Sequence, residues 1–370
     1  MNICIINCFD TYEHRVELLL RSFIEKGHSV KVLTSDFKHI EKSPVKDKKN
    51  NFIYFKTEPY KKNISIARMK SHVKISSEIF SYVIENINTI DVIWVLVPPN
   101  TFVRDAAKVK KKFPQTKVIL DFIDLWPETM PLKCLKNIWP CTEWRNRRSK
   151  YVSYADYVVT ECELFKSNMI DEIKEVKSTV LYLARDIKYI PSNPMLPTDK
   201  VALCYLGSIN NIIDINCISE IIRQISLDHN VELNIIGDGE KREELITASK
   251  KAGAKVVYHG KIYDAAKKQE IYDMCHFGLN IMKQTVCVGL TMKSMDYFEA
   301  GLPIINNIHG DTWEFVENVG IGVNFDKSLE LDDALHNNIT VRKKVREFYM
   351  QTFDSEIFNQ KVNEIIDSLC

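Results

Sequence analysis

Short apolar runs alternate along the chain with segments in which apolar residues recur at helical spacing. Residues 2–7 are an apolar run, residues 16–24 repeat every three or four positions, and residues 29–34 are apolar again. Continuous apolar runs of this length are typical of strands buried on both faces of a sheet. The pattern predicts a doubly wound α/β domain with further strands at 52–55, 91–97, 117–120, 156–160 and 179–183.

The same pattern restarts after residue 200, with apolar runs at 201–206, 231–236, 255–259 and 277–281. Between the two halves, Pro191, Pro194 and Pro197 stand in a stretch without apolar periodicity, which predicts a linker. A last apolar-periodic segment, about 340–369, predicts a helix. The expected organisation is an N-terminal domain at 1–188, a linker at 189–200, a second Rossmann-like domain at 201–345, and a C-terminal helix at 346–370 that packs back on the first domain.

Glycines concentrate in the second half, which holds eleven of the twelve. Three of its predicted strands end in glycine turns, and glycine lets a backbone approach a ligand closely. Because the carboxyl ends of parallel strands meet at one edge of a sheet, these turns predict a rim for phosphate and base. The rim residues are Gly207, Ser208, Gly237, Asp238, Gly239, Gly260 and Ile262.

Residues 289–303 read as one helical unit within that domain. Thr291 is a plausible N-cap behind Gly289, and Gly301 fits the left-handed position after the last helical residue. Lys293 and Asp296 are three residues apart and share one helix face. A free helix N-terminus beside a lysine suits a diphosphate, and a carboxylate one turn later suits ribose hydroxyls. The alternative is a solvated Lys/Asp pair on an ordinary helix.

The strand at 117–120 leads into Asp121, Asp124 and Glu128, which are candidates to hold an acceptor hydroxyl. Asp124 and Glu128, together with Lys293, are the candidate catalytic residues. Alternatively, Asp124 caps the next helix. Thr11 and His14, which follow the first strand, are further candidates for the acceptor side.

Charge differs between the halves: residues 1–200 have 33 Lys and Arg against 24 Asp and Glu, and residues 201–370 have 17 against 25. Within 130–154, tryptophans and tyrosine interleave with six Lys and Arg residues, a pattern suited to an anionic membrane surface. An amphipathic core helix with a solvated face explains the same pattern. No recognised motif supports nucleic-acid binding.

Composition excludes several classes. No run approaches 18 apolar residues, and the first residues lack the basic region of a signal peptide. The ten cysteines include no C-x-x-C pair, which favours reduced thiols over disulfides or zinc. The first strand–helix–strand unit lacks G-x-G-x-x-G, which counts against a dehydrogenase. We therefore expect a cytoplasmic protein, at the inner face of the cell membrane if the basic segment binds lipid.

The sequence resembles the GT-B glycosyltransferases of family 4 (glycosyl transferases group 1), in particular the bacterial surface-polysaccharide branch with an Asp-Leu-Trp-Pro motif. The resemblance rests on residues 124–128, the Gly207 turn, residues 237–239, residues 259–262 and, most specifically, residues 293–303. It implies two Rossmann-like domains facing across a cleft.

In that family, a carboxylate five residues before the Ala-Gly-x-Pro glycine binds the donor ribose, which implies this role for Asp296. The turn after the strand ending at His259 holds the base, which implicates Gly260 and Ile262. Asp124 stands where many members carry a His beside donor sugar and acceptor. The resemblance further implies retention of configuration, and we expect neither metal nor cofactor. The nucleotide sugar, a UDP- or GDP-sugar, is a substrate, and the acceptor is a glycan or lipid-linked glycan.

The chain departs from the family at two places. Val288 replaces the first Glu of the E-x7-E pair, and no Arg or Lys follows Gly207 in residues 208–212. Lys293 is the candidate substitute on the diphosphate. Two other classes stay open: a catalytically silent GT-B partner subunit of another glycosyltransferase, and a non-hydrolysing sugar-nucleotide epimerase.

Overall fold

The computed structural model describes residues 1–62, 65–130, 137–186 and 192–369. These residues form two compact units. Unit 1 contains Met1–Arg185 and Ser355–Cys370, and unit 2 contains Asp186–Asp354. The segment expected at 346–370 is therefore shared between the units, because its first part belongs to unit 2.

Unit 1 is built on a seven-stranded parallel sheet with the order β5-β2-β1-β6-β7-β8-β9. A two-stranded ribbon of β3 and β4 lies outside this sheet. Its strands and helices are β1 (Asn2–Ile6), α1 (Glu13–Glu25), β2 (Ser29–Ser35), β3 (Phe37–Lys38), β4 (Ser43–Pro44), β5 (Phe52–Phe55), α2 (Ile66–Glu85), β6 (Val92–Val97), α3 (Asn100–Lys112), β7 (Lys117–Phe122), α4 (Cys141–Ser149), β8 (Tyr157–Thr160), α5 (Glu163–Asn168), α6 (Ile170–Ile173), β9 (Lys177–Val180) and α14 (Ser355–Asp367).

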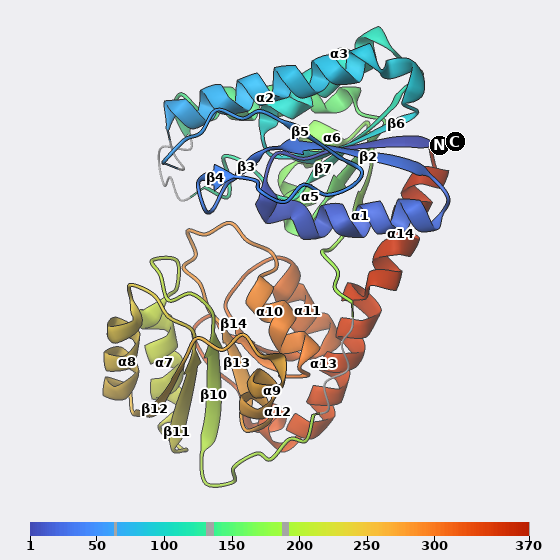
Figure 1. The fold of residues 1–370 in the computed structure, drawn as a ribbon. Helices are drawn as coiled ribbons and strands as arrows, with labels where there is room; N and C mark the ends of the chain where they lie inside the picture. Colours follow the sequence, from blue (N-terminus) through green and yellow to red (C-terminus); the bar gives the residue numbers. More distant parts are fainter. Residues whose placement is uncertain (63–64, 131–136, 187–191, 370) are drawn as a thin grey trace. The chain divides into compact units, whose positions relative to one another are not determined.

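Helices cover both faces of this sheet (Figure 1). Successive side chains of a strand point to opposite faces. Ile3 and Ile5 of β1 therefore pack in the core that holds Leu19 of α1 and Val362 of α14. Cys4 and Ile6 point to the other face and pack in a second core with α2 and α3. The C-terminal helix α14 thus completes the core of unit 1 on its α1 face.

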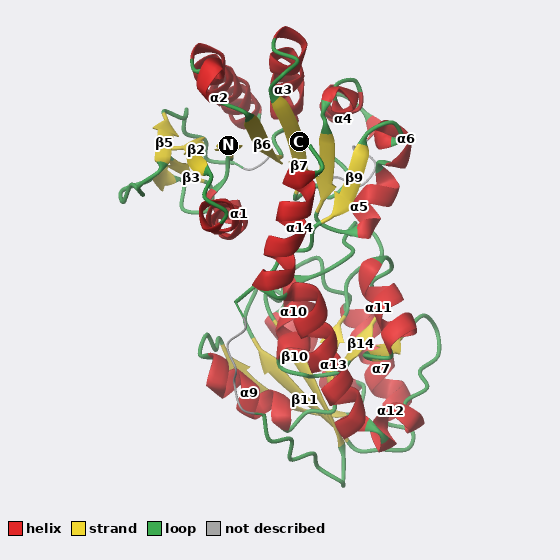
Figure 2. Cartoon of the chain, turned by 90° about the vertical axis from the view of Figure 1, so that its right-hand side faces the viewer, coloured by secondary structure: helices red, strands yellow, loops and turns green. Residues whose placement is uncertain are grey.

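Unit 2 repeats the plan with a six-stranded parallel sheet, order β12-β11-β10-β13-β14-β15 (Figure 2). Both sheets reverse their strand order once, between β1 and β6 and between β10 and β13. The elements of unit 2 are β10 (Val201–Leu206), α7 (Ile215–Ile225), β11 (Val231–Ile236), α8 (Arg242–Lys251), β12 (Ala254–Gly260), α9 (Ala265–Asp273), β13 (Phe277–Asn280), α10 (Met292–Glu299), β14 (Ile304–Asn306), α11 (Asp311–Val319), β15 (Gly322–Asn324), α12 (Asp332–His336) and α13 (Asn338–Phe353).

The expectation of one helix over about 340–369 is wrong, because Asp354 adopts an extended conformation with ψ 142° and separates α13 from α14. The expected helix within 130–154 is confined to α4 and a 3₁₀ turn at Val152–Tyr154, and residues 131–136 lie outside the described residues. Among the helices that the structure describes, none is long and apolar enough to cross a membrane.

Candidate functional site

Three glycine turns meet at the carboxyl edge of the unit 2 sheet. The Gly207 amide donates to the Ile236 carbonyl at 2.9 Å, and the Gly237 amide donates to the Gly260 carbonyl at 2.7 Å. A Cβ on Gly237 would lie 2.0 Å from the Gly207 carbonyl oxygen, and one on Gly239 would lie 2.2 Å from the Ile209 oxygen. Glycine at 237 and 239 is therefore required by the close packing of the turns on each other.

Gly207 and Gly260 differ from that pair. Both have positive φ, 115° and 71°, and a Cβ on either would meet nothing within 4 Å. The space above these two glycines is open, so a ligand can approach their backbone directly. Ile262, two residues after Gly260, is half-buried, and Ser208 is exposed.

Asp238 turns back on its own loop. Its Oδ1 accepts the Gly239 amide at 2.8 Å and the Arg242 guanidinium at 3.2 Å, and these two contacts hold the pKa of this exposed carboxyl below its usual value. The side chain of Asp238 therefore shapes the turn, and its role toward a ligand stays a prediction.

The start of α10 is fixed by a capping box. The Thr291 hydroxyl accepts the Ser294 amide, the Ser294 hydroxyl accepts the Thr291 amide, and the Thr291 hydroxyl also donates to Asn280 Oδ1 at 2.8 Å. The predicted N-cap is confirmed. Gly289 is buried, and its carbonyl accepts the Thr312 amide and hydroxyl at 2.9 and 2.6 Å. Thr291 and Gly289 therefore position the start of the helix. The Thr291 hydroxyl and the Gly289 carbonyl both have hydrogen-bonding partners within the protein.

Tyr297 attaches α10 to the end of β10. Its buried hydroxyl accepts the Leu206 amide at 2.7 Å and donates to the Cys204 carbonyl at 3.1 Å. Its ring lies against Gly278, where a Cβ would come within 2.8 Å of the ring carbons. The helix start is thereby held beside the Gly207 turn, at the point where the strand order reverses. Ligands of open parallel sheets bind at such reversal points.

Lys293, in the first turn of α10, has a half-buried side chain whose ammonium lies 4.7 Å from the centre of the Tyr205 ring. The Tyr205 hydroxyl donates to the Ser208 carbonyl at 3.0 Å, so the same ring joins the lysine to the Gly207 turn. Among the described residues, no carboxylate lies within ion-pair distance of Lys293. Burial lowers the pKa of Lys293 to about 8. The residue is thus a partly desolvated cation beside free backbone amides.

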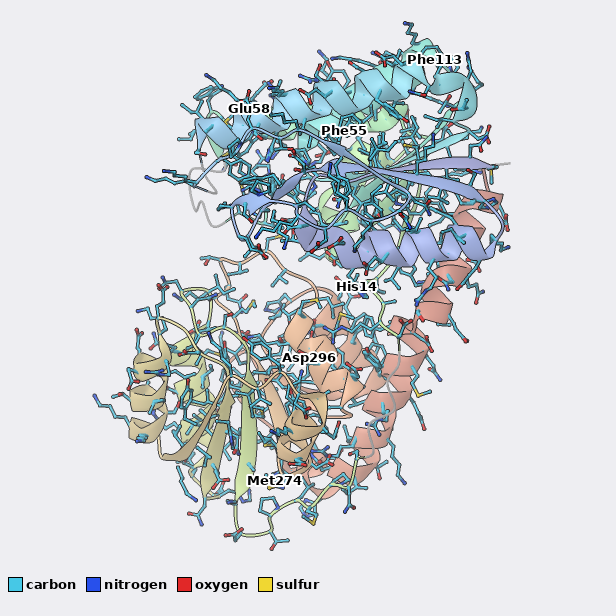
Figure 3. The ribbon with its side chains drawn as sticks, viewed as in Figure 1. His14, Phe55, Glu58, Phe113, Met274 and Asp296 are labelled. Atoms are coloured by element: carbon cyan, nitrogen blue, oxygen red, sulfur yellow. The ribbon has the colours of Figure 1, made fainter. Side chains whose placement is uncertain are left out.

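Asp296 lies one turn further along α10 (Figure 3). Its Oδ1 is 3.9 Å from the ammonium of Lys268 on α9, and both side chains are largely buried. At that distance the pair is a long-range ion pair rather than a hydrogen bond. The carboxylate and Lys293 share α10, as the spacing predicts, but Asp296 has a partner of its own.

In unit 1, Asp124 closes the turn after β7. Its Oδ2 accepts the indole N–H of Trp126 at 2.7 Å, and its Oδ1 accepts the Thr129 hydroxyl. Burial raises the pKa of Asp124 against the lowering effect of these hydrogen bonds. The alternative that Asp124 caps a following helix is wrong, because the residue stabilises a turn within 124–130 and not a helix start. Its role toward an acceptor stays a prediction.

Glu128 is held by arginines of α4. Its carboxylate accepts from Arg145 Nε at 2.8 Å and from both terminal nitrogens of Arg148 at 2.8 and 3.1 Å. These pairs lower the pKa of Glu128. Arg148 also donates to the Trp126 carbonyl at 3.1 Å. Glu128 thus clamps α4 onto the turn after β7, which is a structural explanation for a residue that the sequence offered as catalytic.

The expectation that Asp121 holds an acceptor hydroxyl is wrong. Its side chain is fully buried, and its two oxygens accept from Arg15 at 2.7 and 2.9 Å and from the Trp94 indole at 2.9 Å. No oxygen of Asp121 reaches the surface. Strand β7 buries its last residues on both faces, so a carboxylate there needs internal partners.

Thr11 and His14 lie near the start of α1. Thr11 is exposed in the 3₁₀ turn Asp10–Tyr12, and the His14 imidazole Nε2 donates to the Ala184 carbonyl at 2.8 Å (Figure 3). Both lie within unit 1, and their role toward an acceptor stays a prediction.

Two residues of the unit 2 site were not singled out from the sequence: Tyr205 and Tyr297. Tyr205 belongs to no motif, and its signal in the sequence is that it stands two residues before Gly207. Their roles depend on contacts between β10 and α10, which are far apart along the chain. No group of His, Cys, Asp and Glu among the described residues is arranged to hold a metal ion.

Residues 200–340, most of unit 2, match a family model described as Glycosyl transferases group 1. Among solved structures, sucrose-phosphate synthase from Thermosynechococcus elongatus is similar, with a TM-score of 0.67 and 13% identity over 100% of this chain and 99% of that chain. The chain has the GT-B fold. The lipopolysaccharide outer core galactosyltransferase WaaB (TM-score 0.68, 15% identity) and Anabaena Alr3699/HepE in complex with UDP (0.64, 14%) are similar over 100% of both chains.

No curated protein matches the sequence. The family match to unit 2 and the GT-B fold of the whole chain together support a glycosyltransferase. Three of the similar structures, all of Alr3699/HepE, contain UDP, UDP with glucose, or UDP-glucose.

Proposed function

We propose that this protein transfers a sugar from a UDP- or GDP-sugar to a glycan or lipid-linked acceptor in the assembly of a bacterial surface polysaccharide or glycoconjugate. The observation that carries the proposal is Lys293. Its half-buried ammonium lies over Tyr205 and beside the open Gly207 turn, and no carboxylate of the described residues is within ion-pair distance of it. A diphosphate supplies an anion for it, and the free amides at the start of α10 add donors.

The other donor contacts follow from this placement. With the diphosphate between Lys293 and the Gly207 turn, the ribose hydroxyls lie toward Asp296, which exchanges its long pair with Lys268 for hydrogen bonds. The base lies at the Gly260 turn, where open space surrounds the backbone and Ile262 supplies an apolar contact.

The reaction needs little covalent chemistry from the protein. The bond between the anomeric carbon and the diphosphate oxygen breaks, and a bond from the same carbon to the acceptor oxygen forms on the same face of the sugar. The acceptor proton passes to the departing diphosphate. Lys293 and backbone amides stabilise the developing charge, and Asp124 positions the acceptor. The transfer retains configuration and uses no metal.

The acceptor binds unit 1, whose basic character suits an anionic or phosphate-linked glycan. We place the protein in the cytoplasm at the inner face of the cell membrane, where such acceptors are built.

The first test is a thermal-shift panel of UDP, GDP, CMP and dTDP on the full chain, repeated with Asp296→Ala and Lys293→Ala. We expect stabilisation by UDP or GDP that both variants lose. Lys283→Ala is the matched control, because this exposed lysine donates to the Asn211 carbonyl on the neighbouring loop and lies outside the proposed contacts. No shift with any nucleotide would contradict the proposal.

One observation favours a second candidate. Val288 stands where the resembled family has a Glu, and the loop at 208–212 lacks the family's Arg and Lys, which fits a silent partner subunit. Nucleotide binding distinguishes the two, because a silent subunit would show none and would co-purify with an active glycosyltransferase.

A further inference from the structure

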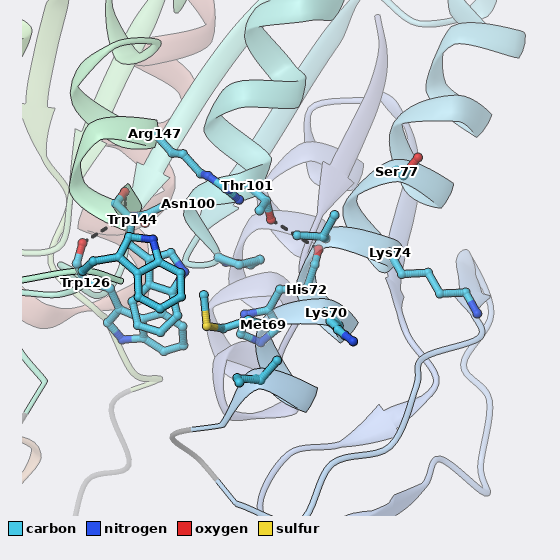
Figure 4. A pocket seen from close by; sticks show the side chains of 14 residues that line it. Met69, Lys70, His72, Lys74, Ser77, Asn100, Thr101, Trp126, Trp144 and Arg147 are labelled. Atoms are coloured by element: carbon cyan, nitrogen blue, oxygen red, sulfur yellow. Dashed lines mark hydrogen bonds between the residues drawn. The ribbon is translucent and has the colours of Figure 1, made fainter. Parts of the chain in front are cut away.

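Unit 1 contains a pocket of about 580 Å³ beside the first half of α2 (Figure 4). Its walls are mainly apolar and aromatic: Met69 and Val73 from α2, Trp144 from α4, and Trp126 and Trp139 from loops. His72 also lines it. Burial and the neighbouring Arg68 hold the pKa of His72 well below its usual value, so the imidazole is neutral at physiological pH and adds no charge to the wall.

The pocket lies where the carboxyl ends of β6 and β7 meet. Asn100, which begins α3 after β6, donates one amide hydrogen to the Trp126 carbonyl at 3.0 Å and the other to the Trp144 carbonyl at 2.8 Å. The Thr101 hydroxyl donates to the His72 carbonyl at 3.3 Å (Figure 4). Four segments of the chain are thereby tied together, so the pocket is a preformed feature of the fold.

Its mouth exposes large apolar side chains. Trp139 is 74% exposed, Ile66 is 70% exposed and Val73 is 40% exposed. Exposed apolar groups that gather around a cavity mark a binding surface rather than chance exposure. Trp is suited to a site that is apolar on one side and wet on the other.

The rim is cationic. Lys70, Lys74 and Arg147 line the pocket, and none of the described lining residues is acidic. Lys74 pairs with Glu58 at 3.0 Å and Arg147 with Glu143 at 2.9 Å, but both acidic side chains are about half exposed. Exposed pairs of this kind contribute little, so a phosphate can replace the carboxylates at small cost.

Trp126 connects the pocket to the candidate acceptor residue. Its side chain lines the pocket, and its indole N–H donates to Asp124 at 2.7 Å. A ligand in the pocket therefore lies one side chain away from the carboxylate that we place beside the acceptor.

We propose that this pocket binds the hydrocarbon chain of a lipid phosphate, with the phosphate on Lys70, Lys74 and Arg147. An apolar cavity with a cationic rim is complementary to an amphiphile of this charge and shape. That the lipid phosphate carries the acceptor rests on the proposed function, whereas its binding does not.

The test uses decyl phosphate below its critical micelle concentration, titrated into the full chain and followed by tryptophan fluorescence. We expect a saturable change in emission, because the Trp139 indole, 74% exposed, leaves water when the hydrocarbon chain binds. Inorganic phosphate and decanol should each bind at least tenfold more weakly, since each satisfies half of the site.

Variants locate the signal. Val73→Asp puts a carboxylate in the mouth and should weaken decyl phosphate at least tenfold. The matched control is Ile24→Asp on α1, 48% exposed and outside the pocket, which should bind as the natural chain does. Val73→Leu keeps the wall apolar and should retain binding. Circular dichroism and urea unfolding check that each variant is folded.

The proposal is overturned if decyl phosphate gives no saturable signal, if folded Val73→Asp binds it as tightly as Ile24→Asp, or if only anionic vesicles bind and the monomer does not. A nucleotide thermal shift on the same samples reports on unit 2 alone. Its loss would contradict the proposed function and leave the lipid result intact.

Discussion

The carboxyl edges of the two sheets have the same topology and opposite chemistry. In unit 2 three strands end in glycine turns, and Lys293 beside the Gly207 turn contacts an aromatic ring. In unit 1 no glycine follows the corresponding strands, and Asp121, Asp124 and Glu128 all have hydrogen-bonding partners. The backbone amides of unit 2 can bind a phosphate only where their turns are open. The pocket of unit 1 can bind a hydrocarbon chain only where its walls are rigid. The residues that directly follow the strands therefore adapt the same sheet topology to different ligands.

The largest loss of stability is expected from breaking the buried ion pair between Arg15 and Asp121 in unit 1. Asp121→Ala leaves Arg15 buried without its carboxylate, and breaking a buried ion pair costs about 3–5 kcal/mol of unfolding free energy. Urea unfolding would measure this loss. Glu58→Ala, which removes the exposed partner of Lys74, is the control and should cost about 0–1 kcal/mol. Equal losses would show that burial does not separate the two pairs.

Gly237→Ala tests whether the turns of unit 2 depend on close backbone packing. Its φ of 139° and the approach to Gly207 predict destabilisation of at least ~1–3 kcal/mol together with loss of UDP or GDP binding. Gly260→Ala, with φ 71° and open space around it, should cost only about 1–2 kcal/mol from backbone strain. Thermal unfolding with and without nucleotide measures both, and the reverse order would refute the packing argument.

Lys293 should make nucleotide binding depend on pH in a specific window. Its folded pKa of about 8 means that the unliganded chain loses this charge as pH rises through 8, so nucleotide affinity should fall by up to tenfold per unit above it. A diphosphate is fully charged at this pH and adds no opposing change. Calorimetry between pH 7 and 9 would detect the fall. Lys293→Ala should bind at least tenfold more weakly at pH 7 and show a flat profile.

The same shift predicts an effect on stability. The folded pKa of Lys293 lies below the usual 10.5, so between pH 8 and 10.5 the unfolded chain binds more protons and this residue's contribution to stability rises with pH. Lys293→Met should therefore raise the melting temperature of the unliganded protein near pH 7. A lower melting temperature would show that the ammonium is not desolvated.

The smallest effect concerns Tyr205→Phe. Removing the hydroxyl deletes the hydrogen bond to the Ser208 carbonyl and keeps the ring under Lys293, so nucleotide binding should weaken by about 0.5–1.5 kcal/mol. Tyr258→Phe, at a half-exposed position on β12, is the control. Isothermal titration would compare them, and an unchanged affinity for Tyr205→Phe would show that the hydroxyl does not set the turn.

Local patterns were sufficient for most of the strands and for the α10 unit. The run at 201–206 forms β10 as predicted, and Thr291 caps α10 with Gly301 at positive φ after it, because these depend on neighbours within a few residues. The break at Asp354 was missed, since apolar residues continue at helical spacing on both sides of it. The extended conformation there follows from packing α13 and α14 in different units.

The sequence by itself determined two doubly wound domains and which of them carries glycine turns, because periodicity and turn residues act locally. Only the tertiary structure decided which charged side chains can contact a ligand and which are paired within the protein. In the sequence, Asp121 and Asp124 are two similar carboxylates at the end of the same strand. In the structure, Asp121 is buried and paired with Arg15, whereas Asp124 accepts a hydrogen bond from Trp126, which lines a pocket. Lys293 looks like a surface lysine, and β10 places Tyr205 under it. Burial and partners come from segments far apart in the chain, and they set the charge and reach of a side chain.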